Sequence, residues 1–278
     1  RGNLFPRSSL FSFIIESLRK KNTVKRKLLF NIFCTLFSIS GTFAQNAPVS
    51  SLPVKTGCPG TVVSIPVTVT GFSNIGSVSL IFKYNPSVLT IVSATNTSGF
   101  PGLVFGYGIP GKVVISGYST NAVTFGDNAV LCTFTFNYLG GTSALTWYDT
   151  GSTCEFTDFP NYNTLNDIPY ANFYMNGQVG PTLDVNFTAD ALFPAINQAV
   201  AFSDLTTGDP TSWNWAITPE SFDYLNGTNP ASQNPQVQFT QNGPYKVALS
   251  ATKGTCTITK TIDNFIHCGI NGLWTGLI

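Results

Sequence analysis

The chain has 278 residues, with 14 basic and 13 acidic side chains and a formal net charge of +1. The basic residues are concentrated in residues 1–27. From Leu28 onward the chain contains twelve acidic and only six basic residues. This acidic, charge-poor remainder excludes a nucleic-acid partner, because phosphate binding needs clustered Lys and Arg. The single histidine, His267, excludes a metal site built from several histidines. Helix formers such as Met and Glu are scarce, so we predict an all-β protein.

The first predicted element is an export signal. Three bases at 25–27 precede a mostly apolar run over 28–43, and small residues lie before a possible cut at Gln45. This is the layout of a secretory signal peptide, and the run is shorter than the roughly 20 residues of a membrane span. We predict a signal peptide over 24–45, with 1–23 as upstream sequence read through. The protein would then be secreted, extracellular or at the cell surface, and would touch a membrane only through the cleaved signal.

Residues 46–180 alternate between short apolar runs and turn residues. In 62–69 every second residue is Val or Ile, which predicts a strand with one buried face. The next strand buries Val78, Leu80 and Phe82 by the same pattern. Further strands are predicted at 89–94, 113–118, 131–138, 144–148 and 172–179. About nine short strands fit a two-sheet sandwich with a jelly-roll outline.

Residues 181–268 form a second strand-rich block after Gly180-Pro181. Strands are predicted at 184–189, 199–204, 212–217, 235–239, 245–252 and 257–266. Trp213 and Trp215 share a face of one strand and are predicted as core, and Tyr245 opens a late strand. A core Trp in an early strand and a Tyr at the start of a late one are typical of an Ig-like sandwich.

The first block resembles the cohesin family over roughly residues 50–179. The resemblance is carried by 60–69, Gly71-Phe72-Ser73-Asn74-Ile75-Gly76, Tyr84-Asn85-Pro86-Ser87-Val88-Leu89, 111–116 and 131–138. It implies a nine-stranded jelly-roll β-sandwich. It also implies that a flat face of the sandwich binds a partner module, dockerin, in cellulose-degrading assemblies.

The second block resembles the PKD-type (polycystic-kidney-disease) Ig-like repeats. The resemblance is carried by Phe202-Ser203-Asp204, Trp213-Asn214-Trp215-Ala216-Ile217, Gln233-Asn234-Pro235 and 242–249. A long loop over 218–235 replaces the acidic turn of that family. The resemblance implies a spacer domain, and residues 269–278 are predicted to open a further, truncated module.

Five cysteines would remain after cleavage of the signal, so at least one has no partner within the chain. Cys132 falls on the apolar face of its strand and is predicted to be a buried free thiol. The strand between Cys256 and Cys268 would hold them about 40 Å apart, too far for a disulfide. In the cohesin fold the first and last strands run parallel, and from this resemblance we expect a disulfide between Cys58 and Cys154.

No arrangement of residues predicts catalysis, a cofactor or a metal site. Asp149, Glu155 and Asp158 fall in one predicted loop, where turn formation is the ordinary role of Asp. His267 stands beside Cys268 at a strand end and is predicted as a surface histidine. We therefore predict that the chain is not an enzyme.

The candidate protein-binding surface is the outward face of the strand around residue 80. Its side chains are small, apolar or singly charged, which gives a shallow face that a partner module of the dockerin type could cover: Ser77, Ser79, Ile81 and Lys83. The competing interpretation is an ordinary solvated sheet face.

A polysaccharide is the second candidate ligand. Aromatic side chains are large and rigid enough to stack on sugar rings, and Tyr118 and Tyr148 are the candidates in the first block. Two further hypotheses stay open. The chain could be a structural stalk of a surface adhesin, or an accessory region of a secreted enzyme that degrades polysaccharides.

Overall fold

The computed structural model describes residues 45–96 and 99–269. The predicted signal peptide, apart from Gln45, and all of the predicted further module except Gly269 lie outside the described residues. Apart from one short 3-10 helix, η1 (Tyr170–Asn172), the described elements are strands, which confirms the all-β class. No helix among the described residues is long and apolar enough to cross a membrane.

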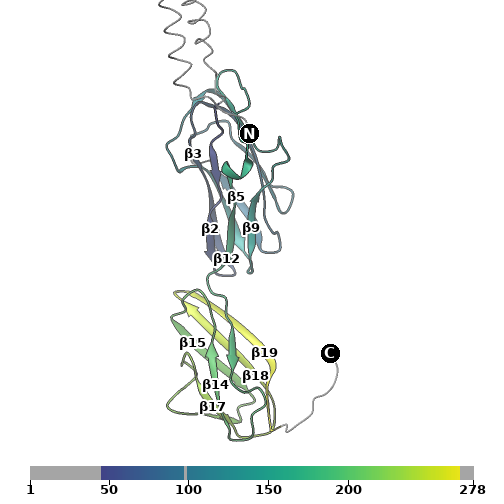
Figure 1. Cartoon of the computed structure of the whole chain (residues 1–278), viewed down its shortest axis with the longest axis vertical. Coiled ribbons are helices and arrows are strands. Elements are labelled where there is room, and N and C mark those ends of the chain that lie inside the picture. The colour runs from purple at the N-terminus through teal and green to yellow at the C-terminus, as the bar shows by residue number, and fades with distance from the viewer. Residues whose placement is uncertain (1–44, 97–98, 270–278) are drawn as a thin grey trace, which may run out of the picture. The chain divides into compact units, whose positions relative to one another are not determined.

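The first sandwich, residues 46–181, consists of two sheets (Figure 1). The five-stranded sheet contains, in spatial order, β11 (Tyr174–Met175), β1 (Val49–Ser51), β3 (Thr61–Thr70), β8 (Ala129–Tyr138) and β5 (Leu89–Thr95). The seven-stranded sheet contains β2 (Val54–Gly57), β12 (Gly177–Pro181), β9 (Ser143–Trp147), β4 (Ile75–Lys83), β7 (Lys112–Val123) and β6 (Val104–Gly106). Its remaining strand, β10 (Glu155–Asp158), also pairs with β4.

The core of the first sandwich is built from alternate residues of both sheets. Phe82 of β4 is fully buried and packs edge-on against Phe134 of β8, with ring centroids 5.4 Å apart. Trp147 of β9 packs against the same Phe82 ring at 5.9 Å. The period-2 pattern that predicts β3, β4 and β8 is therefore the pattern of burial in the structure.

The opening and closing segments each cross from one sheet to the other. β1 and β11 pair in parallel in the five-stranded sheet, and β2 and β12 pair in parallel in the seven-stranded sheet. The closing segment crosses beside Leu52 at Gly177, where a Cβ would lie only 2.6 Å from the carbonyl oxygen of Leu52. The prediction of nine strands and of one strand over 172–179 is thus wrong. Alternation along a sequence cannot reveal where a strand changes sheets, and β6 and β10 are too short to stand out.

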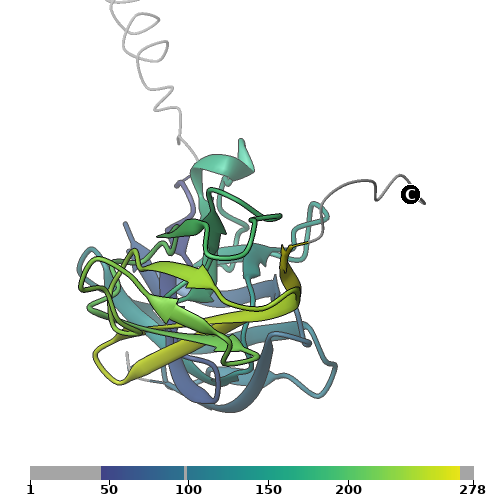
Figure 2. The ribbon, with the colours of Figure 1, turned by 90° about the horizontal axis from the view of Figure 1, so that it is seen from below.

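The second sandwich has a four-stranded and a three-stranded sheet. The first contains β13 (Phe187–Ala189), β14 (Ala199–Asp204), β17 (Gln236–Phe239) and β16 (Phe222–Tyr224), and the second contains β15 (Ser212–Thr218), β18 (Gly243–Lys253) and β19 (Cys256–Cys268). All pairs are antiparallel. The long strands β18 and β19 run side by side as the yellow-green and yellow ribbons of Figure 2.

Aromatic side chains organise the second core. Trp215 is buried, and Trp213 is half-buried with its indole N–H donating to Asp204 at 2.7 Å, so both belong to the core as predicted. Tyr245 is fully buried, and its hydroxyl donates to the carbonyl of Gln241, four residues upstream, at 2.9 Å. This contact has the form of a tyrosine corner, which ties a strand to the loop before it.

The disulfide of the structure joins Cys58 to Cys256, with Cα atoms 5.5 Å apart, so the expected Cys58–Cys154 bond is wrong. The first and last strands are parallel as expected, but this does not bring Cys154 to Cys58. The loop that carries Cys154 leads into β10, which pairs with β4, and the Ile81 amide donates to the Cys154 sulfur at 3.4 Å. Cys58 instead directly follows β2, and Cys256 opens β19.

Candidate functional site

The outward face of β4 carries the predicted docking residues. Val78, Leu80 and Phe82 point inward and are buried. Ser77, Ser79 and Ile81 alternate with them and are half-buried, and Lys83 is exposed. The alternation therefore places all four predicted residues on one side of the seven-stranded sheet, as the sequence indicates.

The neighbouring strands β7 and β6 widen this face. Directly opposite residues of an antiparallel pair share one side of the sheet. The cross-strand pairs are Ser77 with Tyr118, Ser79 with Ser116, Ile81 with Val114, and Lys83 with Lys112, while Val104 of β6 lies opposite Ser116. We call these nine residues, together with Tyr148, the β4–β7 face.

The two tyrosines predicted as sugar-stacking residues lie on this same face. Tyr118 is 66% exposed. The Tyr148 amide donates to the carbonyl of Ile81 at 2.8 Å, which continues β9 along β4 and turns Trp147 inward. The Nζ of Lys83 lies 3.3 Å from the centre of the Tyr148 ring. The structure thus brings together two sets of candidates that the sequence treats separately.

Most of the face is apolar or carries hydroxyl groups. Val104 is 64% exposed, beside half-buried Val114 and Ile81. The Ser77 hydroxyl is hydrogen-bonded to Thr157 of β10 at 2.6 Å. The hydroxyl of Ser79 makes no hydrogen bond to any described residue. The face therefore offers exposed apolar surface and a free hydroxyl, which suits a broad contact with another molecule.

Close backbone packing fixes the end of the face at Tyr118. The segment that leads to β6 crosses β7 at Gly117, where a Cβ would lie 2.9 Å from the Cα of Leu103. Tyr162 supports the neighbouring residue, since its hydroxyl donates to the carbonyl of Ser119 at 2.8 Å. The backbone on both sides of Tyr118 is therefore held in place, by packing at Gly117 and by a hydrogen bond at Ser119.

The sequence reading missed four residues of the face: Val104, Lys112, Val114 and Ser116. The alternation in 113–118 indicates that Val114 and Ser116 share a side with Tyr118. What it does not indicate is that this strand pairs with β4, because the pairing joins distant segments. The short strand β6, with Val104, has no periodic signal.

Asp149 lies in the β9–β10 loop, but Glu155 and Asp158 are the first and last residues of β10, so the prediction that the three acids share one loop is wrong. Asp149 and Asp158 do form turns, as predicted. One carboxylate oxygen of Asp149 accepts hydrogen bonds from the amides of Gly151, Thr153 and Cys154 at 3.1–3.2 Å. The carboxylate of Asp158 accepts from the amide of Asn163 at 2.8 Å. Asp149 thus closes the turn before β10 and Asp158 the turn after it. Within the described chain no three His, Cys, Asp or Glu side chains are grouped so as to hold a metal ion.

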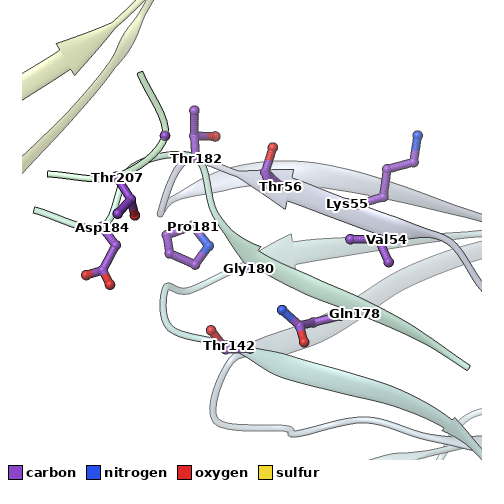
Figure 3. A pocket seen from close by; sticks show the side chains of 11 residues that line it. Val54, Lys55, Thr56, Thr142, Gln178, Gly180, Pro181, Thr182, Asp184 and Thr207 are labelled. Atoms are coloured by element: carbon purple, nitrogen blue, oxygen red, sulfur yellow. The ribbon is translucent and has the colours of Figure 1, made fainter. Parts of the chain in front are cut away.

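A pocket of about 260 Å³ lies where β2 and β12 end and the chain continues past Pro181 (Figure 3). Its polar side chains include Thr56, Thr142, Gln178 and Asp184, and Pro181 lies beside Asp184 in the figure. No aromatic side chain is among the residues that line it. The pocket therefore offers hydrogen bonds but no ring on which a sugar could stack.

Three cysteines of the described chain are free thiols: Cys132, Cys154 and Cys268, all buried. This confirms the prediction for Cys132. Burial raises the pKa of Cys154 to about 11, and the negative charges of Asp149 and Asp167 act in the same direction. Burial also raises the pKa of Cys132 and of Cys268 above the usual value of a thiol. A protonated thiol is a poor nucleophile, so these groups are inert.

We therefore expect iodoacetamide to leave the three thiols unmodified in the native chain at about pH 8, because thiolate is the reactive species. Labelling of Cys154 should rise as the pH approaches 11. Peptide mass spectrometry resolves the three sites, and the chain unfolded in guanidinium is the control in which all of them react. If Cys154 in the native chain were labelled at about pH 8 as fast as in the unfolded chain, this would contradict its burial.

The model of the Cohesin domain family matches residues 48–158. This segment contains β4, β6, β7 and β10 and with them the β4–β7 face. This match agrees with the resemblance to the cohesin family seen in the sequence of the first sandwich. No curated protein matches the chain.

Several solved cohesins resemble the first sandwich at low sequence identity. The sixth cohesin of scaffoldin B from Acetivibrio cellulolyticus, solved with a dockerin mutant, has a TM-score of 0.41 at 18% identity, over 49% of this chain and 99% of that one. The cohesin CaCohA2 from Clostridium acetobutylicum has a TM-score of 0.40 at 19% identity, over 49% and 92%. A non-cellulosomal cohesin from Archaeoglobus fulgidus has 0.39 at 21% identity, over 48% and 88%.

Proposed function

We propose that the chain is a non-catalytic docking protein whose β4–β7 face binds a protein module of the dockerin type. The observation that carries this proposal is the position of the face: an outward, half-apolar sheet surface inside the segment that matches the Cohesin domain family. Cohesin domains bind dockerin partners, and exposed Val104 and Tyr118 provide apolar contact area for one.

A protein partner fits this face better than a polysaccharide does. Stacking on a sugar needs a free ring face, and Lys83 lies over the ring of Tyr148. Tyr118 is opposite Ser77, whereas Tyr148 is beside Ile81, four residues or about 13 Å further along β4. The two rings therefore do not form one continuous stacking platform.

For the second sandwich we propose a PKD-type spacer, and for the whole chain an extracellular or cell-surface location. Sheets of four and three strands, the buried Trp215 and the tyrosine corner of Tyr245 support an Ig-like spacer. The Cys58–Cys256 disulfide supports export, because disulfides persist in oxidising compartments.

The docking function is tested with the full chain and a display library of dockerin modules. We expect the library to yield binders, and Tyr118→Ala and Val104→Asp each to weaken their binding by at least about tenfold, since large side chains at the centre of an interface contribute most of its energy. Surface plasmon resonance measures the affinities.

Val62→Asp is the matched control for Val104→Asp. Val62 is also an exposed strand valine, 59% against 64%, but it belongs to β3 of the other sheet. We expect the affinity of Val62→Asp for the dockerin modules to stay within about twofold of the affinity of the parent chain, because surface changes outside an interface have little effect on binding. If no dockerin module binds, the docking function is wrong and a structural stalk becomes the better hypothesis.

A further inference from the structure

Two lysines stand directly opposite each other at one end of the β4–β7 face: Lys83 of β4 and Lys112 of β7. Residues 46–181 contain one other base, Lys55, against five acids. Like charges placed directly opposite each other destabilise a strand pair. Two of the three bases of an acidic domain thus lie where they repel each other.

Neither lysine is neutralised within the part of the chain that the structure describes. The ion pairs there lie in the second sandwich. On the same sheet, Glu155 of β10 lies opposite Ser79, four residues or about 13 Å along β4 from Lys83. The positive charge at this end of the face is therefore available to a partner.

The ammonium group of Lys83 also contacts an aromatic ring, which favours one position of its side chain. Its Nζ lies 3.3 Å from the centre of the Tyr148 ring, and a cation over an aromatic face is held by the ring electrons. Lys112 is half-buried, so its side chain is partly confined as well. Charges that are already in place lose less conformational entropy when they bind an anion.

We propose that the protein module bound by the β4–β7 face presents a carboxylate to Lys83 and Lys112, next to an apolar side chain that packs on Ile81 and Val114. This inference rests on the proposed docking function and adds the chemistry of the partner. The lysine pair and the Ile81–Val114 pair are two residues apart, which is about 7 Å along a strand.

This spacing sets a sequence pattern for a helical partner that lies along the strands. One helical turn rises 5.4 Å, and residues three or four apart share a helix face. The binding helix should therefore carry Asp or Glu three or four residues from a large apolar residue. A partner with Lys or Arg at that position would be repelled.

The test compares the full chain with Lys112→Glu, using the same display library of dockerin modules. Lys112→Glu turns the like-charged pair into an attractive one, so the variant should melt at the same temperature or higher, which confirms that it folds. We expect the modules selected by the parent chain to bear the acidic pattern and to bind Lys112→Glu at least about tenfold more weakly. Their association with the parent chain should slow as salt is added, because salt screens charge attraction.

Lys55→Glu is the matched control, with the same charge change on β2 of the same sandwich. We expect it to bind the selected modules within about twofold of the parent chain, since a charge remote from the contact has little effect on its affinity. If modules bind and Tyr118→Ala weakens them, but Lys112→Glu behaves like Lys55→Glu, the acidic partner is wrong while docking stands. If no module binds, the docking function fails and this inference fails with it.

Discussion

Replacement of Phe82 by alanine is expected to destabilise the first sandwich by about 3–5 kcal/mol, the usual cost of removing a buried aromatic side chain. Phe82 is fully buried, and its ring touches Phe134 of the opposite sheet and Trp147 of its own sheet. The substitution would therefore leave a cavity between the two sheets, at the level of the lysine pair on the outer face.

Urea denaturation followed by fluorescence measures this effect, because Trp147 reports on the first sandwich and Trp215 on the second. We expect the transition of the first sandwich to move to lower urea and that of the second to move less. Val62→Ala, at an exposed strand position, is the control and should change stability by no more than about 0.5 kcal/mol. A loss below about 1 kcal/mol for Phe82→Ala would contradict its central place in the core.

Removal of the Cys58–Cys256 disulfide by paired serine substitutions should lower the free energy of unfolding by about 2–5 kcal/mol. The bond closes a loop with a sequence separation of 198 residues, and a cross-link over a long loop restricts the unfolded chain strongly. Urea denaturation of the oxidised parent chain and of the double variant measures the difference.

The same experiment tests the pairing itself. Digestion without reductant should release one linked peptide pair that contains Cys58 and Cys256, and Cys154 should appear as a free thiol. The parent chain treated with reductant is the control and should unfold like the double variant. A linked peptide that joins Cys58 to Cys154 would contradict the structure.

Composition and alternation were enough to predict the class of fold and the two faces of the main strands. Alternation in β3 and β4 identified which side chains are buried, because successive residues of a strand point to opposite sides of the sheet. It therefore placed Ser77, Ser79, Ile81 and Lys83 outward correctly. It also identified Cys132 as a buried thiol, since its neighbours on that face are apolar.

Which segments lie next to one another depends on how the whole chain packs. Strand pairing joins residues far apart in the chain, and its register follows from how two sheets pack, which a local pattern does not encode. This is why the pairing of Lys83 with Lys112 was not foreseen, and why Cys58 was assigned to Cys154 instead of Cys256. The outward residues of β4 form the proposed binding surface, with two lysines at one end, only because β7 lies beside them.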